Sequence, residues 1–261
     1  MAEGEAGPVL VGVVHLLALP GSPRWGGSPD AVCAAAAADA VAYAAGGAGA
    51  VIVENFGDVP FTRGRVEAET VAGMALAAAA VRGACGLPVG FNVLRNDVRS
   101  ALGLAAACGG EMVRVNVHCG SAATDQGVIE GEAFATMRVR AGLCPGVEVW
   151  ADVHVKHATP LGDEGIGAAA EETLGRGLAD AVVVSGSGTG KATARGDLEA
   201  VRGACPGARI YVGSGATVEN AGELLRCADG LIVGSSLKRD GVLSNPVDVE
   251  RVKRLAEVVR G

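Results

Sequence analysis

The stretch VEVWADVHV, residues 147–155, alternates strictly between two kinds of side chain. Its odd positions are all Val or Ala, whereas its even positions are Glu148, Trp150, Asp152 and His154, and Lys156 follows in the same register. Because successive side chains of a strand point to opposite faces, this segment predicts a strand with one apolar and one polar face. The polar face either meets water or lines the inside of a barrel.

The rest of the chain repeats one unit, in which a β-branched run and a turn precede an Ala/Leu-rich helical stretch. The predicted strands are 9–16, 50–56, 88–94, 112–119, 147–155, 181–186, 209–214 and 230–235, and the predicted helices are 30–45, 66–84, 97–108, 129–142, 164–176, 196–204, 217–227 and 246–259. Eight such units in this length predict a single (β/α)8 TIM barrel. An open doubly wound sheet is the alternative, but the first strand–helix junction lacks GxGxxG.

The domain boundaries follow from this pattern. We expect residues 1–8 to form a flexible N-terminus and residues 9–261 to form the barrel. In a parallel sheet covered by helices, the apolar face of each strand meets the helices and the polar face points into the barrel. Polar groups placed there need one another or a ligand.

Composition narrows the class of protein. The 261 residues are 49% hydrophobic and 20% charged, with a formal net charge of −7, so a large core is expected and general nucleic-acid binding is not. The seven cysteines include no CxxC pair, which argues against a disulfide framework or a zinc ribbon. The N-terminus lacks the features of a signal peptide, and no run is long and apolar enough to be a transmembrane segment. These features predict a cytoplasmic protein, with a homo-oligomer left open.

Titratable and amide side chains gather at the predicted carboxyl ends of the strands, where barrel enzymes carry their active sites. The candidate catalytic residues are Glu54, His118, Asp152, His154 and Lys156, and the candidate substrate-binding residues are His15, Asn92, Arg95, Asn116 and Asp125. Clustering of this kind separates pKa values in the way that acid–base catalysis requires. Lys156 is open to three interpretations: a Schiff-base amine, an anion-binding group, or an ion-pair partner of Asp152.

The last three strands end in Gly/Ser-rich turns, namely SGSGTGK (185–191), VGSGAT (212–217) and IVGSSLKRDG (232–241). Glycines allow backbone N–H groups to approach an oxyanion, and the loops after strands seven and eight are a common phosphate site in barrels. The candidate phosphate-binding residues are Ser185, Gly186, Gly213, Ser214, Gly215, Gly234, Ser235, Ser236 and Lys238. The spacing in SGSGTGK does not fit the GxxxxGK[ST] motif of an NTPase.

Together these features predict an enzyme that acts on a small phosphorylated ligand, a sugar phosphate or a phosphoribosyl-type compound. Isomerase, aldolase and lyase chemistry remain open, as does cleavage at a phosphoribosyl carbon by the carboxylate pair Glu54 and Asp152. No cofactor is specified. A divalent metal held by His15, Glu54, Asp152 or His154 is compatible with the sequence, although ligands on separate strands have no fixed spacing.

Long motifs then support a resemblance that covers residues 9 to about 250. GVVHLLALPGSP (12–23), VENFGDVPF (53–61), GFNVLRND (90–97), RVNVHCG (114–120), TDQGVIEG (124–131) and ADVHVKHATPL (151–161) closely resemble the BtpA/SgcQ family of TIM-barrel proteins. The resemblance implies a TIM barrel with a phosphate site. One branch of this family is linked to photosystem I biogenesis and another to sugar-uptake genes, so the alternative to an enzyme is a non-catalytic biogenesis or regulatory factor that binds a phospho-ligand or a partner protein.

Overall fold

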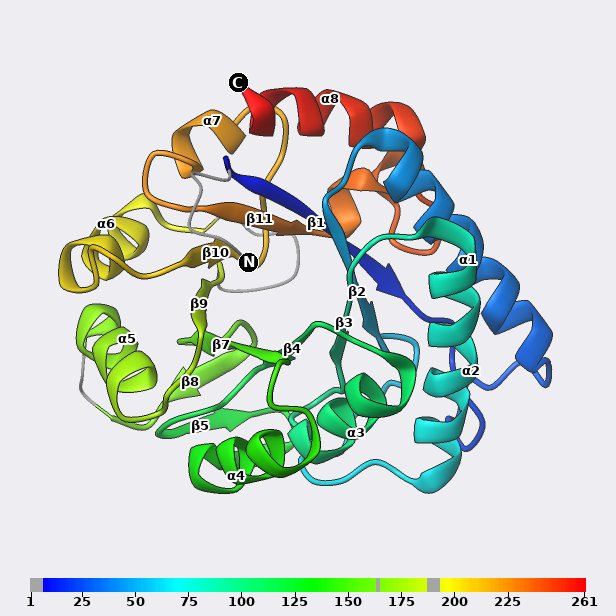
Figure 1. The fold of residues 1–261 in the computed structure, drawn as a ribbon, viewed down its shortest axis with the longest axis horizontal. Coiled ribbons are helices and arrows are strands. Elements are labelled where there is room, and N and C mark those ends of the chain that lie inside the picture. The colour runs from blue at the N-terminus through cyan, green and yellow to red at the C-terminus, as the bar shows by residue number, and fades with distance from the viewer. Residues whose placement is uncertain (1–6, 163–164, 187–192) are drawn as a thin grey trace.

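The computed structural model describes residues 7–162, 165–186 and 193–261. Within them, eight parallel strands close into a barrel in the order β1-β11-β10-β9-β7-β4-β3-β2, and helices surround it (Figure 1). The predicted (β/α)8 barrel is confirmed. No helix in the described ranges is long and apolar enough to span a membrane.

The element boundaries lie close to the predicted ones at most positions. The barrel strands are β1 (Val9–His15), β2 (Ala50–Glu54), β3 (Val89–Asn92), β4 (Met112–Val115), β7 (Glu148–Val153), β9 (Ala181–Val184), β10 (Ile210–Val212) and β11 (Gly230–Val233). The helices are α1 (Pro29–Gly46), α2 (Ala68–Cys85), α3 (Val98–Cys108), α4 (Ala133–Leu143), α5 (Ile166–Gly175), α6 (Arg195–Ala204), α7 (Ala221–Leu224) and α8 (Val249–Arg260), with short 3-10 turns η1 (Ser235–Leu237) and η2 (Arg239–Gly241).

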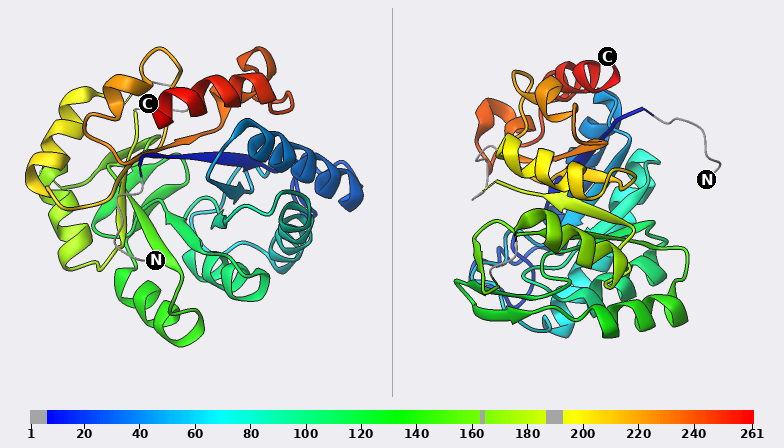
Figure 2. Two further views of the ribbon diagram at one scale, coloured as in Figure 1. Left: turned by 45° about the horizontal axis from the view of Figure 1, so that its top comes forward. Right: turned by 90° about the vertical axis from the view of Figure 1, so that its left-hand side faces the viewer.

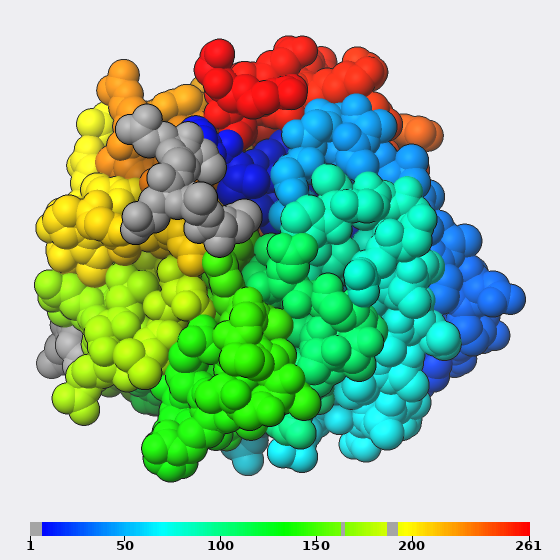
Figure 3. All heavy atoms as spheres, viewed as in Figure 1, coloured from blue at the N-terminus to red at the C-terminus, as the bar shows by residue number. Residues whose placement is uncertain are grey.

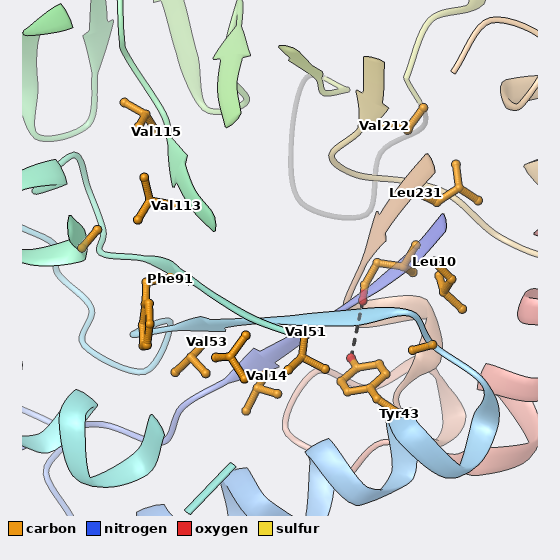
Figure 4. Packing of buried hydrophobic residues seen from close by; sticks show 14 of the residues in the cluster. Leu10, Val14, Tyr43, Val51, Val53, Phe91, Val113, Val115, Val212 and Leu231 are labelled. Carbon is orange, nitrogen blue, oxygen red and sulfur yellow. Dashed lines mark hydrogen bonds between the residues drawn. The ribbon is translucent and has the colours of Figure 1, made fainter. Parts of the chain in front are cut away.

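Alternation along the strands separates two cores, as the sequence predicts. Val51, Phe91 and Val113 point outward and pack against the helices in the larger cluster (Figure 4). The inward positions form a second cluster that includes Trp150 and Tyr211, whose rings stack with centroids 4.2 Å apart. The barrel is therefore filled at its amino end, and the polar inward residues are left for the carboxyl end.

The Ala-rich helices fit closely around this barrel, and Figure 3 shows them as a continuous outer ring in chain order. On β1, a Cβ atom at Gly12 would lie 2.4 Å from the ring of Tyr43, so only glycine admits this side chain of α1. The Tyr43 hydroxyl donates a hydrogen bond of 3.0 Å to the carbonyl of Val13. Ser28 caps the start of helix α1 by accepting a hydrogen bond from the N–H of Ala31, and Gly47, with φ of 89°, caps its end.

A second, three-stranded antiparallel sheet was not predicted. It consists of β5 (Ser121–Thr124), β6 (Gly127–Glu130) and β8 (Ala158–Pro160), in the order β6-β5-β8, and lies at one end of the barrel (Figure 2, green). The helix predicted over 129–142 therefore begins only at Ala133, because Ile129 packs in this sheet instead. The helix predicted over 217–227 is reduced to the single turn of α7.

Candidate active site at the carboxyl ends of the strands

A buried ion pair occupies the centre of the barrel at its carboxyl end. Arg114 on β4 donates from Nε to Asp152 Oδ2 at 2.9 Å and from a terminal nitrogen to Oδ1 at 2.8 Å. Asn116 donates to Asp152 Oδ2 at 3.0 Å, and the Ser185 hydroxyl donates to Oδ1 at 3.0 Å. Both carboxylate oxygens of Asp152 are therefore engaged, so we assign this residue a positioning role and not that of a proton carrier.

Two amides extend this network along the neighbouring strands. Asn92 on β3 donates to Asn116 Oδ1 and to the carbonyl of Arg114, each at 3.1 Å. The two asparagines, predicted as substrate-binding residues, thus hold the ion pair in place. Arg114 itself was not among the candidates, although its inward parity between Met112 and Asn116 was a usable signal.

Beside the ion pair lies a small cavity of about 50 Å³. Four ionisable residues line this cavity, namely His15, Glu54, Arg114 and Lys156. The turns after β10 and β11 also line it, with Gly213, Ser214, Gly215, Gly234, Ser235 and Ser236. The structure therefore brings Lys156 and Glu54 together with six of the nine predicted phosphate-binding residues. Two more of the nine lie alongside: Ser185 in the ion-pair network, and Gly186, whose N–H donates to Ser214 Oγ at 3.0 Å.

Burial and neighbouring cations control protonation in this cavity. Burial lowers the pKa of Lys156, and the nearby Arg114 lowers it further, whereas Glu54 acts in the opposite direction. Burial, reinforced by Lys238, Lys156 and Arg114, lowers the pKa of His15 to about 3, so its imidazole is neutral near pH 7. His15 Nε2 lies 3.7 Å from Glu54 Oε1, and its Nδ1 is buried without a hydrogen-bond partner. The cavity thus combines an amine that deprotonates more easily than usual with a carboxylate and a neutral imidazole.

Two glycines of the turns make room for these side chains. A Cβ atom at Gly213 would lie 2.7 Å from a terminal nitrogen of Arg114, and one at Gly234 would lie 2.4 Å from Cε1 of His15. The backbone of both turns therefore reaches the cavity only because a side chain is missing there.

The turns also offer hydrogen-bond donors. Within the described part of the chain, no hydrogen bond uses the N–H groups of Gly215, Ser235 or Ser236. The Ser236 hydroxyl donates to the carbonyl of Ala216 at 2.8 Å, which ties the β11 turn to the β10 turn. Adjacent N–H groups without acceptors form the kind of concavity that binds an oxyanion.

Three predicted residues lie elsewhere. The chain after β7 turns at His154 with φ of 51°, which breaks the alternation. His154 lines a second pocket near β8 and α5, which it shares with Asn116 and Asp152, and not the cavity of Lys156. His118 packs against the segment after α5, with Nε2 2.8 Å from the carbonyl of Gly177, and burial lowers its pKa. The ammonium of Lys238 pairs with Asp39 of α1 in a buried ion pair. Of the predicted cluster, the structure thus places Asp152 and His154 on one pocket, Lys156 on the cavity beside the ion pair, and His118 against the segment after α5.

Two further candidates lie at the edge of the mouth. Asp125 is exposed in the turn between β5 and β6. Arg95 is buried, donates to the carbonyl of Lys156 at 2.5 Å, and has its Nε without a partner. Burial lowers the pKa of Arg95, while Asp152 and Asp125 oppose that shift. As for a metal, the described residues contain no group of three or more His, Cys, Asp or Glu side chains arranged to hold one.

Comparison with known proteins places this architecture in a family. Residues 7–261 match the BtpA family. The chain belongs to the BtpA family. This BtpA-family chain is 46% identical to the photosystem I biogenesis protein BtpA of Synechocystis sp., over 96% of its own length and 87% of that protein. It is also 46% identical to an uncharacterized protein of Thermococcus kodakarensis, and 31% identical to the sgc region protein SgcQ of Escherichia coli over 93% of that protein.

Solved structures with the same fold are much more distant in sequence. Phosphoribosyl anthranilate isomerase from Thermus thermophilus superposes with a TM-score of 0.56 at 16% identity, covering 96% of this chain and 98% of the isomerase. Orotidine 5'-phosphate decarboxylase from Pyrococcus horikoshii superposes with a TM-score of 0.55 at 16% identity, covering 97% and 100%. At this identity the likeness establishes the TIM barrel and not the reaction.

Proposed function

We propose that this BtpA-family protein is an enzyme that binds the phosphate of a small phosphorylated compound at the turns after β10 and β11. The observation that carries the proposal is the position of Lys156 and Glu54 in the same cavity as the N–H groups of Gly215, Ser235 and Ser236. Donors for an oxyanion on one side and a readily deprotonated amine on the other suit a substrate that is held by its phosphate and reacts a few atoms away.

The chemistry divides between two reactions of the Lys156 amine. As a nucleophile, it adds to a substrate carbonyl and releases water to form an imine, the first step of many aldolases and lyases. As a general base, it removes a proton from carbon and returns it to a neighbouring carbon, which is isomerisation. Glu54 is the second proton-transfer group in either case. Burial lowers the pKa of Lys156, and the positive charge of Arg114, which is fixed by Asp152, lowers it further.

Distant fold relatives support the same class. The two solved structures are an isomerase of phosphoribosyl anthranilate and a decarboxylase of orotidine 5'-phosphate. For this chain that support extends to the architecture, and the cavity residues carry the rest of the proposal.

The test of phosphate binding is thermal denaturation against a panel of sugar phosphates and phosphoribosyl compounds, since a ligand of the folded state raises Tm. We expect at least one compound to raise the Tm of the wild type. In Ser235→Asp, where a carboxylate competes for the same N–H groups, the shift is lost. Ala79→Asp on the exposed side of α2 adds the same charge far from the cavity and keeps the shift. A panel without any shift, or a shift that survives Ser235→Asp, refutes the proposed phosphate site.

The role of Lys156 is tested on the compounds that bind. Borohydride reduction followed by peptide mass analysis detects an imine on Lys156. Lys156→Met abolishes turnover, whereas Lys253→Met, which removes an exposed lysine paired with Glu250, leaves turnover unchanged. If turnover persists in Lys156→Met, the catalytic assignment fails.

A non-catalytic function is the second candidate, because a relative 46% identical to this chain is named for photosystem I biogenesis. A binding factor of that kind holds the phosphorylated compound without converting it. Incubation with the bound compound and analysis by mass spectrometry separates the two functions.

A further inference from the structure

A wide apolar groove lies next to the cavity, on the side of β1 and α1. It has a volume of about 850 Å³, against about 50 Å³ for the cavity beside Lys156. The residues that make it apolar include Leu17, Trp25, Val32, Ala35, Phe56 and Leu243. Small-molecule sites are typically grooves of this size with mostly apolar walls and few polar groups.

The groove is adjacent to the cavity, and one side chain forms part of both walls. His15 contributes to the walls of both, and its ring contacts Phe56 with centroids 4.7 Å apart. Because burial holds the pKa of His15 at about 3, this shared wall is an uncharged ring. The boundary between the cavity and the groove therefore carries no charge at His15.

The polar groups of the groove are largely neutralised. Lys238 and Asp39, which reach its wall, are paired with each other and buried. The backbone N–H of Val247 donates to the other oxygen of Asp39 at 2.8 Å. Arg24 also lines the groove, but it is exposed to solvent, so among the described lining residues the buried charges are paired and the buried walls favour an apolar group.

We propose that the substrate is a phosphate ester that carries a large apolar group, of the size of an aromatic ring or more, and that this group lies in the groove. The inference rests on the proposed phosphate site and adds to it the chemical class of the remainder of the molecule. A simple sugar phosphate leaves the groove filled with water, whereas an ester with an apolar group buries the exposed side chain of Leu17 and its neighbours.

The experiment compares three probes by calorimetry: inorganic phosphate, 4-phenylbutyl phosphate and 4-phenylbutan-1-ol. Each is measured on the wild type, on Ala35→Trp, which fills the groove from an exposed position of α1, and on Ala34→Trp, the adjacent exposed residue that does not line it. We expect 4-phenylbutyl phosphate to bind at least tenfold more tightly than inorganic phosphate. Ala35→Trp removes this gain and leaves the affinity for inorganic phosphate unchanged, and Ala34→Trp changes neither.

The possible failures are distinguishable. If inorganic phosphate binds but 4-phenylbutyl phosphate gains nothing, the groove proposal is wrong and the proposed phosphate site stands. If neither phosphate compound binds, the proposed phosphate site is wrong, and the binding of 4-phenylbutan-1-ol then tests the groove alone. Binding of this alcohol that is lost in Ala35→Trp supports an apolar subsite in the groove. Absence of binding overturns it. Light scattering is run in parallel. A wild-type dimer that Ala35→Trp dissociates shows that the groove covers a second copy of the chain, which also overturns the proposal.

Discussion

Replacing Asp152 by asparagine tests the ion pair on which the site is built. The side chain of Asp152 is fully buried and that of Arg114 is 3% exposed. Burial alone lowers the pKa of Arg114, but Asp152 more than offsets this effect and raises it, so the guanidinium is charged. In Asp152→Asn this charge loses its counterion, and the amide nitrogen of the new side chain faces groups that themselves donate hydrogen bonds.

The magnitude follows from burial and geometry. Breaking a buried pair by removing one partner costs about 3–5 kcal/mol, because the remaining charge is neither solvated nor compensated. An exposed pair costs less than about 1 kcal/mol. Arg195, whose 60% exposed side chain pairs with both Glu199 and Glu223, provides the exposed comparison. We therefore expect Asp152→Asn to lower the free energy of unfolding by about 3 kcal/mol or more, and Arg195→Met to lower it far less.

Urea unfolding followed by tryptophan fluorescence measures both values, since Trp150 is stacked inside the barrel. The double variant Arg114→Met with Asp152→Leu removes both charges and regains most of the loss, because an apolar pair of similar size needs no counterion. If Asp152→Asn is no more destabilising than Arg195→Met, the ion pair does not hold the site and the positioning role is refuted.

Three further predictions concern the residues around the cavity. Gly234→Ala is expected to lower the free energy of unfolding in urea by about 1–3 kcal/mol, because the added Cβ would clash with the His15 ring. Gly222→Ala is the control: nothing lies within 4 Å of its added Cβ, so the free energy of unfolding changes by less than about 0.5 kcal/mol or rises. The pKa of His15 falls from 6.5 in the unfolded state to about 3 in the folded state, so the unfolded state binds the proton more readily. The contribution of His15 to the free energy of unfolding is therefore fully present above pH 6.5 and decreases as the pH falls toward 3, by up to about 1.4 kcal/mol per pH unit. A pH series with His15→Gln that shows the same decline contradicts this assignment. Lys238→Met is expected to lower the free energy of unfolding by about 3 kcal/mol, because Asp39 is left buried without its partner, while the phosphate affinity measured by calorimetry stays within twofold. A loss of phosphate affinity without a loss of stability would show instead that Lys238 binds the phosphate.

The local alternation of apolar and polar residues was sufficient to predict the barrel and part of the candidate site. The alternation identifies the inward side chains along β3 and β7 and one residue beyond the end of β4, and Asn92, Asp152 and Asn116 accordingly meet inside the barrel. The same rule fails at His154, because φ turns positive there and the alternation ends with the strand. Lys156 nevertheless reaches the cavity, from the loop and not from the strand.

The remaining errors concern partners that lie far apart in the chain. Lys238 follows a Gly/Ser turn in the sequence, yet its partner Asp39 lies 199 residues away on α1. His118 follows the polar parity of β4, yet it is held by a carbonyl 59 residues further on. The sheet of β5, β6 and β8 joins segments from two loops that each look helical or irregular alone.

The sequence by itself determined the (β/α)8 architecture, the inward face of each strand and the position of the Gly/Ser turns, because periodicity and turn composition act over a few residues. Only the tertiary structure decided which inward charged groups form ion pairs with one another and which remain available to a ligand. Arg114 and Asp152 neutralise each other, as do Lys238 and Asp39, and the cavity is left to Lys156, Glu54 and His15. The physical reason is that pairing of buried charges depends on distances across the barrel, which no local pattern contains.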